Sequence, residues 1–339
     1  MNRLLKTAIT LVVACLGWSA SAGLAQRPDA QEAAELTGRV EIDGSSMVYP
    51  ISQAVTVEFF RKHPKVRITV AVSGTGGGFK RFSRGETDVS NASRPIRLSE
   101  LQACKEGGVE FIELPVAYDA LAVVVNPAND WARDMTVADL KKIFLAGGAK
   151  TWSDVRDDWP REPIKIYAPG QDSGTYDYFF GDVLNRDRRG EPRRDGISFH
   201  EDDNVLVEGV ARDKHAISFL GCAYYFENQD KLRAVSLVDD DGRKAAPSVE
   251  TVEGGTYLLS RPLFIYVNQK SLARPECAAF VEFYLDNNAT IAAKVGYVPL
   301  NMNLTSRIRK RWEMEHTGTL FLDDKGRPRR ESLSEIYAK

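Results

Sequence analysis

Apolar residues follow two alternating patterns along this chain. Short runs rich in valine, isoleucine and aromatic residues predict strands at residues 40–42, 66–72, 111–114, 121–125, 164–167, 217–220 and 263–267. Between them lie longer segments whose apolar residues recur at the spacing of a helix. Strands that alternate with helices in this way indicate an α/β fold with a largely parallel sheet.

The starts of four helices can be placed on the sequence. The first helix is expected over residues 47–62, where apolar residues recur at helical spacing until Pro64 ends the pattern. A second is expected to begin in the glycine run 76–78 and to turn Phe79 and Phe82 toward the core. A third helix is expected to start at Gly174 or Thr175. A fourth is expected to start near Asp203 and Asn204, whose side chains are good helix caps.

Four short loops of hydroxyl residues and glycines lie where these elements meet. They are Asp-Gly-Ser-Ser-Met at 43–47, Ser-Gly-Thr-Gly-Gly-Gly at 73–78, Asn-Ala-Ser-Arg-Pro at 91–95 and Gly-Gln-Asp-Ser-Gly-Thr at 170–175. A helix N-terminus leaves backbone N–H groups without partners and carries a partial positive charge. Ligands of open α/β sheets bind beyond the carboxyl ends of strands, so three of these helix starts are expected to face one anion.

The candidate ligand groups for this anion are hydroxyls, backbone amides and one guanidinium. They are Ser45, Ser46, Met47 through its amide, Ser73, Gly74, Thr75, Gly76, Arg94, Asp172, Ser173, Gly174 and Thr175. A dianion in a dry cleft needs many such donors to replace its hydration. Arg94 adds a full positive charge and a bidentate clamp, and extended backbone before Pro95 helps to aim it.

Plainer structural roles stay open for several of these residues. The glycine run is compatible with a flexible turn, and Ser45, Ser46 and Asp172 with ordinary helix caps. Arg94 is able to pair with an acid such as Glu86 instead of a ligand. The ordered set of four loops favours a binding site, because independent structural accidents do not reproduce the whole pattern.

Charge and the N-terminal segment narrow the class of protein. The 339-residue chain has a formal net charge of −2, which argues against nucleic acid or an anionic membrane as the partner. Residues 1–22 resemble a signal peptide, with Arg3 and Lys6 before an apolar run and Ala20-Ser21-Ala22 as the cleavage site. Lipid modification of Cys15 is the alternative to ordinary cleavage.

The remaining cysteines and the histidines give no sign of a metal or a catalytic centre. Cys104, Cys222 and Cys277 lack metal-ligand spacing, so buried or free thiols are expected, with one disulfide as the alternative. The histidines are scattered, at His63, His200, His215 and His316. The sequence has neither a Gly-x-Ser-x-Gly elbow nor a phosphate loop with its lysine. We therefore expect a binding protein without metal or cofactor rather than an enzyme.

Taken together, the motifs resemble the PstS/SphX type of periplasmic phosphate-binding protein. The likeness rests on the segments 43–51, 72–82, 85–96 and 172–179, with further matches at 114–119, 202–207 and 296–300. The order and combination of these motifs carry the resemblance, which extends from about residue 38 to residue 300.

The resemblance implies a type II periplasmic-binding-protein fold with two lobes and a ligand cleft between them. Lobe one is expected to hold residues 38–116 and 263–312, lobe two 117–262, and 313–339 to form a solvated C-terminal tail. Crossings between the lobes are expected near 115–120 and 260–263. The implied function is capture of inorganic phosphate by a periplasmic monomer and its delivery to an inner-membrane ABC permease and ATPase complex.

Three positions depart from the best-known members of this family. Those members resemble this chain in their hydroxyl residues but have aspartate where Arg94 stands, arginine where Pro169 stands and threonine where Met47 stands. Arg94 still counters the charge of the ligand, whereas the carboxylate that discriminates phosphate from sulfate is in doubt. Asp172 is the candidate and Asp88 the reserve, because a carboxylate accepts a proton from hydrogen phosphate and finds none on sulfate. A phosphate-ester hydrolase or sensor of the same fold, and a binder of another oxyanion, stay open as alternatives.

Overall fold

The computed structural model describes residues 35–170, 173–184, 195–200, 202–329 and 331–338. The expected signal peptide and Asp172 lie outside these ranges. From Leu36 onward the chain forms one compact unit. Within the described part, no helix combines the length and the hydropathy needed to cross a membrane.

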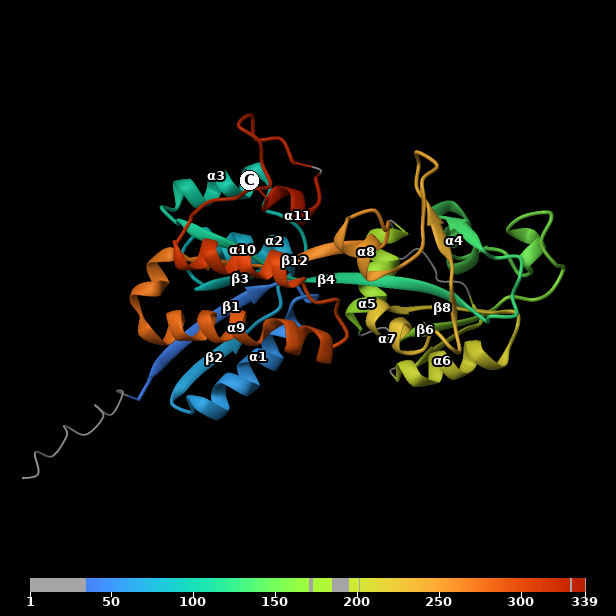
Figure 1. Cartoon of the computed structure of the whole chain (residues 1–339), viewed down its shortest axis with the longest axis horizontal. Helices are drawn as coiled ribbons and strands as arrows, with labels where there is room; N and C mark the ends of the chain where they lie inside the picture. Colours follow the sequence, from blue (N-terminus) through green and yellow to red (C-terminus); the bar gives the residue numbers. More distant parts are fainter. Residues whose placement is uncertain (1–34, 171–172, 185–194, 201, 330, 339) are drawn as a thin grey trace, which may run out of the picture. The chain divides into compact units, whose positions relative to one another are not determined.

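A mixed sheet runs through this unit (Figure 1). Among the described residues it has nine strands, eight of them in the order β2-β1-β3-β12-β4-β8-β6-β7, while β9 pairs with β4. The strands are β1 Gly38–Gly44, β2 Val66–Val70, β3 Val89–Ala92, β4 Phe111–Val125, β6 Lys165–Pro169, β7 Ile197–His200, β8 Ala216–Gly221, β9 Arg233–Ala234 and β12 Ser260–Asn268. A smaller sheet contains β5 Asp134–Thr136, β10 Ser236–Val238 and β11 Lys244–Ala245.

The main sheet is parallel at its two ends and antiparallel in its middle. β1 pairs in parallel with β2 and β3, and β6 with β7 and β8. β12 runs antiparallel to both β3 and β4, and β4 antiparallel to β8. The expected α/β class is therefore confirmed, whereas the expectation of a largely parallel sheet holds only for the ends.

β4 is one strand of 15 residues, although the sequence predicts two short ones in its place. All of its residues are buried, which explains why its apolar runs show no alternation. Pro115 is tolerated because the pairing with β12 shifts register beside it, between Leu263 and Phe264. β4 pairs with β12 as far as Ala120 and with β8 from Leu121 onward. β4 thus changes its pairing partner near residue 120, close to the crossing between lobes that the resemblance implies at 115–120. The boundaries of the two lobes stay a prediction.

The four helices expected from the sequence are found. They are α1 Tyr49–Lys62, α2 Gly74–Phe82, α5 Gly174–Asp177 and α6 Asp203–Arg212. However, α1 starts at Tyr49 rather than at residue 47, and α2 starts at Gly74, before the glycine run 76–78. The remaining α-helices are α3 Leu98–Glu106, α4 Val137–Phe144, α7 Cys222–Glu227, α8 Val249–Glu253, α9 Pro275–Lys294, α10 Met302–Glu313 and α11 Leu333–Ile336. Short 3₁₀ turns occupy Trp152–Asp154 and Gln269–Ala273, and a π-helical turn, Tyr178–Val183, follows α5 directly.

Two aromatic clusters hold the helices on the sheet. Phe59 of α1 packs edge-on against Phe280 of α9, with ring centroids 5.4 Å apart, and Figure 1 shows these helices side by side. Farther along the sheet, Phe179 stacks on Phe219 of β8 at 3.8 Å, with Phe144 edge-on to both. Burial of such rings supplies much of the driving force for folding.

The end of the chain is not the solvated tail expected from its charge. Leu304, Ile308 and Trp312 of α10 are buried, and so are Leu333 and Ile336 of α11. Between these helices, Phe321 packs edge-on against Phe264 of β12 at 5.1 Å. We refer to residues 314–337 as the C-terminal segment. Its buried residues Phe321, Leu333, Ile336 and Tyr337 belong to the core, whereas residues 314–317 are exposed.

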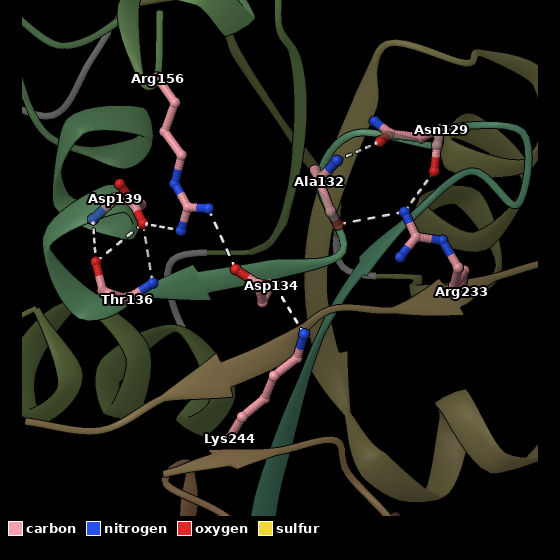
Figure 2. Close-up of polar contacts among 8 residues, drawn as sticks. All are labelled: Asn129, Ala132, Asp134, Thr136, Asp139, Arg156, Arg233 and Lys244. Carbon is pink, nitrogen blue, oxygen red and sulfur yellow. Dashed lines mark hydrogen bonds and ion pairs between the residues drawn. The ribbon is translucent and has the colours of Figure 1, made fainter. Parts of the chain in front are cut away.

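Polar contacts organise the region around β5 (Figure 2). Arg156 donates to Asp134 at 3.2 Å and to Asp139 at 2.8 Å, and Lys244 of β11 reaches the other oxygen of Asp134 at 2.7 Å. Thr136 and Asp139 cap the start of α4 reciprocally. These contacts join the small sheet to α4 and to the loop that carries Arg156.

The three cysteines described are buried and free, as one of the two readings of the sequence expects. Burial raises the pKa of the Cys104 thiol to about 11 and that of the Cys277 thiol to about 12. The thiolate form is therefore scarce at neutral pH.

Candidate anion-binding site

Most of the predicted ligand residues line one cavity of about 950 Å³. Its lining is Ser45, Ser46, Met47, Val72, Ser73, Gly74, Thr75, Gly76, Ser93, Arg94, Arg97, Asp177, Tyr178, Asp182 and Arg261. The first three predicted loops thus meet at one place. No three His, Cys, Asp or Glu side chains gather closely enough to hold a metal ion in the described parts of the chain.

The loop after β1 is shaped by a glycine that no other residue replaces easily. Gly44 has φ +141°, and a side-chain carbon there would lie 2.1 Å from the carbonyl oxygen of Asn91. The next amide, Ser45 N, donates to that same oxygen at 2.9 Å. The N-cap of α1 is Val48, and no side chain caps this helix. In the turn before the helix, the Ser45 hydroxyl accepts from Met47 N at 3.2 Å, so this amide, a predicted ligand donor, has a partner inside the protein. Ser46 lines the cavity beside it.

The loops after β2 and β3 are bonded to each other. The hydroxyls of Thr75 and Ser93 lie 3.1 Å apart, and Ser93 N donates to Thr75 Oγ1 at 3.2 Å. Ser73 is the N-cap of α2 but makes no capping hydrogen bond with its side chain. Phe79 and Phe82 are buried as predicted and fix α2 on the sheet. Two hydroxyl loops are thus held as one wall of the cavity.

Arg94 lines the cavity while it is held by a carboxylate. Its Nη2 and Nη1 donate to the two carboxylate oxygens of Glu100 at 2.7 and 2.8 Å, and its guanidinium lies 5.9 Å from the centre of the Phe79 ring. The paired acid is therefore Glu100, whereas Glu86, the acid suggested by the sequence, binds Arg81 and Arg84. A bidentate pair fixes the plane of the guanidinium, and Nη1 also donates to the carbonyl oxygen of Pro95 at 3.1 Å. Among the described residues, Nε and the second N–H of Nη2 have no acceptor in these contacts.

The fourth predicted loop contributes differently. Ser173 is the N-cap of α5 and accepts from Tyr176 N at 3.1 Å, and neither Ser173 nor Thr175 is among the lining residues. Gly174 lies beside Met47, because a side-chain carbon on this glycine would be 2.9 Å from the Met47 sulfur. The loop therefore lies next to the cavity wall at that sulfur.

The structure does not bring Asp88 to the cavity. Its carboxylate accepts from Glu41 N at 2.9 Å and from the Ser271 hydroxyl at 2.7 Å, and it pairs with Arg274. These contacts tie β1 to the start of α9. Of the two carboxylates suggested by the sequence, Asp88 has a structural place and Asp172 lies outside the described residues.

Arg261 is a largely buried cationic lining residue that sequence reasoning missed. It donates through Nε to Asp119 at 3.1 Å and through Nη1 to Asp182 at 2.5 Å, and its guanidinium lies 3.6 Å from the centre of the Tyr178 ring. Its side chain is 15% exposed and that of Asp119 only 8%. The signal that marked Arg94, an arginine directly before a proline, also marks Arg261 before Pro262.

Burial and charge oppose each other in this cluster. Burial raises the pKa of Asp119, and the positive charge of Arg261 and its hydrogen bond act against that rise. Burial alone would lower the pKa of Arg261, but the charge of Asp119 and that of Asp182 outweigh it and raise this pKa. Each group therefore offsets part of the cost of burying the charge of the other.

Comparison with known proteins covers the whole region that carries the cavity loops. A family model described as a PBP superfamily domain matches residues 29–288. Protein SphX of Synechococcus elongatus is 45% identical over 295 residues, which are 86% of this chain and 86% of that protein. The phosphate-binding protein PstS of Staphylococcus saprophyticus is 38% identical over 265 residues, 78% of this chain and 81% of that protein.

A solved structure agrees with these matches. The crystal structure of a possible phosphate binding protein from Planctomyces limnophilus is 42% identical and superimposes with a TM-score of 0.78. The match covers 83% of this chain and 99% of that one. Sequence and fold therefore lead to one family.

Proposed function

This chain belongs to the PstS/SphX family of the PBP superfamily, and from that premise we propose that it is a receptor for inorganic phosphate. In this proposal it captures phosphate outside the cytoplasm and delivers it to an ABC importer. It acts as a binding protein rather than an enzyme, in line with the relative that is named as a phosphate-binding protein.

The observation that carries this proposal is the meeting of three hydroxyl loops and Arg94 on one cavity. A phosphate dianion offers four oxygens, and each needs donors once water has been removed. The hydroxyls of Ser46, Ser73 and Thr75, with the amides around Gly76, supply neutral donors at the starts of α1 and α2. Arg94 supplies the formal positive charge.

The donors at the starts of α1 and α2 favour a ligand with a high density of charge, while Glu100 balances the charge of Arg94. The Glu100 carboxylate offsets the guanidinium charge when the cavity holds no ligand, so the site is not left with an uncompensated cation. A bound dianion adds negative charge, and the donors of α1 and α2 must offset it. A weakly charged ligand gains less from these donors and binds less tightly.

The loop of Ser173, Gly174 and Thr175 is proposed to complete the site when phosphate binds. Its position beside Met47 supports this role. Closure of such a receptor around its ligand creates a loaded state that differs in shape from the empty one, and a transporter is able to distinguish the two. Asp172, in the same loop, is the proposed carboxylate that excludes sulfate.

The proposal also includes export and partners. Residues 1–22 are proposed to direct the chain to the periplasm and to be removed by cleavage. The mature receptor is proposed to act as a monomer that meets an inner-membrane permease and its ATPase. Neither nucleic acid nor a cofactor takes part.

Isothermal titration tests the proposed function. The mature protein, stripped of bound anion, is expected to bind one phosphate with micromolar or tighter affinity at neutral pH. Titration with sulfate is expected to show no binding. The same sample is expected to leave a chromogenic phosphate ester intact. Absence of phosphate binding, or turnover of the ester, would contradict the proposal.

A further inference from the structure

A buried carboxylate that is not part of the cavity lining lies near the start of β4. Glu113 is 0% exposed. Its Oε2 accepts from the Tyr266 hydroxyl at 2.9 Å and from the Thr319 hydroxyl at 2.6 Å, and its Oε1 accepts from Leu320 N at 3.0 Å. Burying a carboxylate is costly, and these donors offset the cost.

Two of the three donors come from the C-terminal segment. Thr319 and Leu320 belong to it, and Tyr337 near its end donates to the main-chain oxygen of Glu113 at 3.1 Å. Arg311 of α10 donates to the carbonyl of Gly318 and so holds the start of the segment. The C-terminal segment therefore closes over Glu113 and takes the place of water there.

The third donor, Tyr266, connects Glu113 to Ile96, which follows the loop of Arg94. Its hydroxyl donates to Glu113 and at the same time accepts from Ile96 N at 2.9 Å. Its ring is fixed edge-on against Phe79 at 4.8 Å and Phe111 at 5.5 Å. A hydroxyl that donates one hydrogen bond becomes a better acceptor itself, so the bond to Glu113 strengthens the hold of Tyr266 on Ile96.

Ile96 is two residues after Arg94, and Pro95 between them has no N–H. The amide of Ile96 is thus the first main-chain donor after Arg94 that can be bonded. On the other side, Ser93 N is bonded to Thr75 at 3.2 Å. The short loop that carries Arg94 is held at both ends.

We propose that Glu113 and Tyr266 are positioning residues for Arg94, and that the C-terminal segment is the element that completes this anchor. The inference rests on the proposed phosphate function and adds to it. A loop fixed before the ligand arrives loses less conformational freedom on binding, so part of the affinity originates from residues that never touch the ligand.

A plainer role for Glu113 predicts a different outcome. If the carboxylate only fastens the C-terminal segment to β4, loss of any of its donors affects stability alone. If it also positions Arg94, the loss of Tyr266 as an acceptor for Ile96 affects phosphate binding in particular. Tyr266 and Thr319 both donate to Glu113 Oε2, so variants of these two residues distinguish the two roles.

Tyr266→Phe and Thr319→Val form the matched pair of variants. Each removes one hydroxyl donor from Glu113 Oε2, but only Tyr266 also bonds Ile96. Thr319 accepts from Phe321 N as well, so its loss disturbs the C-terminal segment more. We expect Tyr266→Phe to raise the Kd for phosphate by about tenfold and Thr319→Val to raise it less than about threefold.

Nuclear magnetic resonance supplies a readout that a purely structural role does not move. In Tyr266→Phe the Ile96 amide proton is expected to shift upfield and lose protection from exchange, and the Arg94 Nε–H signal to broaden. Glu113→Gln keeps the shape and removes the charge, and it is expected to shift both signals in the same direction by less. It is the second variant if Tyr266→Phe does not fold.

Three results would overturn the inference. One is an unchanged phosphate Kd in Tyr266→Phe, and another is an equal rise in both hydroxyl variants. The third is an Arg94 signal that stays sharp in Tyr266→Phe and Glu113→Gln. The Arg94 signal is read without phosphate, so it decides the inference even if the wild-type protein binds no phosphate and the proposed function fails.

Discussion

Two arginine–carboxylate clusters, one at the cavity and one beside the small sheet, differ in the number of carboxylates that the arginine binds and in whether it lines the cavity. Arg94 donates through Nη1 and Nη2 to one carboxylate, that of Glu100, and through Nη1 also to the carbonyl oxygen of Pro95, and it lines the cavity. Arg156 spends the same two nitrogens on Asp134 and Asp139, stacks on Trp159 at 4.9 Å and lines no part of that cavity.

The difference separates a binding arginine from a structural one. Arg156 joins two elements, so its loss loosens the fold around β5 (Figure 2). Arg94 and Glu100 lie six residues apart, so their pair shapes one loop and leaves the rest of the fold to other contacts. Arg261 belongs to both types, since it bridges two carboxylates and also lines the cavity.

Arg261→Ala is expected to have the largest effect, because it breaks a buried ion pair. Asp119 would stay buried without its partner, and the free energy of unfolding should fall by about 3 kcal/mol. Chemical denaturation measures this loss, and titration with phosphate should show weaker binding as well. Asp182→Asn is the matched control, since that carboxylate is 54% exposed and its loss should cost less than about 1 kcal/mol. Equal losses in the two variants would contradict the assignment.

Arg94→Ala is expected to weaken phosphate binding by about 2 kcal/mol, roughly thirtyfold in Kd, because a charge-assisted contact is lost. The melting temperature should change little, since Glu100 still accepts from Arg97 N at 2.9 Å. Arg97→Ala, which removes another cationic side chain of the cavity lining, is the control and should change Kd by less than about threefold. Unchanged affinity in Arg94→Ala would contradict the clamp.

Asp172→Asn addresses selectivity instead of affinity. Arg94 attracts any oxyanion, so a carboxylate must supply the discrimination, and the variant is expected to lose about tenfold of the preference for phosphate over sulfate. Competition titrations with the two anions measure this ratio. Asp182→Asn is again the control, and a loss of preference there instead would transfer the role to Asp182.

Arg156→Gln is expected to lower stability by about 1 kcal/mol and to leave the phosphate Kd unchanged. Burial raises the pKa of Asp139, but hydrogen bonds from Arg156 and Thr136 outweigh it and hold this pKa below its ordinary value of 3.8. Lys244 and Arg156 hold the pKa of Asp134 below that value too.

The stability from these carboxylates is present above their ordinary pKa and is lost as the pH falls through the lowered folded-state pKa. Denaturation at a series of acidic pH values should therefore show a smaller fall in the variant than in the wild type. An identical pH dependence would show that Arg156 does not stabilise the two carboxylates.

The sequence predicted the elements that depend on local pattern and missed those that depend on distant partners. β1 and α2 follow from apolar spacing and short-range turn chemistry. β3 was missed because Ser90 and Asn91 are polar yet buried, and the side-chain oxygen of Asn91 is satisfied by a distant residue, Ser52, whose hydroxyl donates to Asn91 Oδ1 at 3.0 Å. β4 was broken in two because its internal Asp119 is neutralised by Arg261, far along the chain.

The same distinction holds for the site. Loops 43–47, 73–78 and 91–95 were found because serine, threonine and glycine at helix starts have a direct physical meaning. Arg261 and Glu113 were missed because each needs a partner more than 100 residues away to be tolerated inside the protein. The C-terminal segment was interpreted as a solvated tail because its sequence is rich in charge. Its contact with the buried carboxylate of Glu113 cannot be recognised from a local pattern.

The most direct test of this account is a crystal structure of the protein loaded with phosphate. The account predicts one anion within hydrogen-bonding distance of Arg94, Thr75 and the amides at the start of α2, with Glu100 still paired to Arg94. An anion bound elsewhere, or one that Arg94 does not contact, would contradict it.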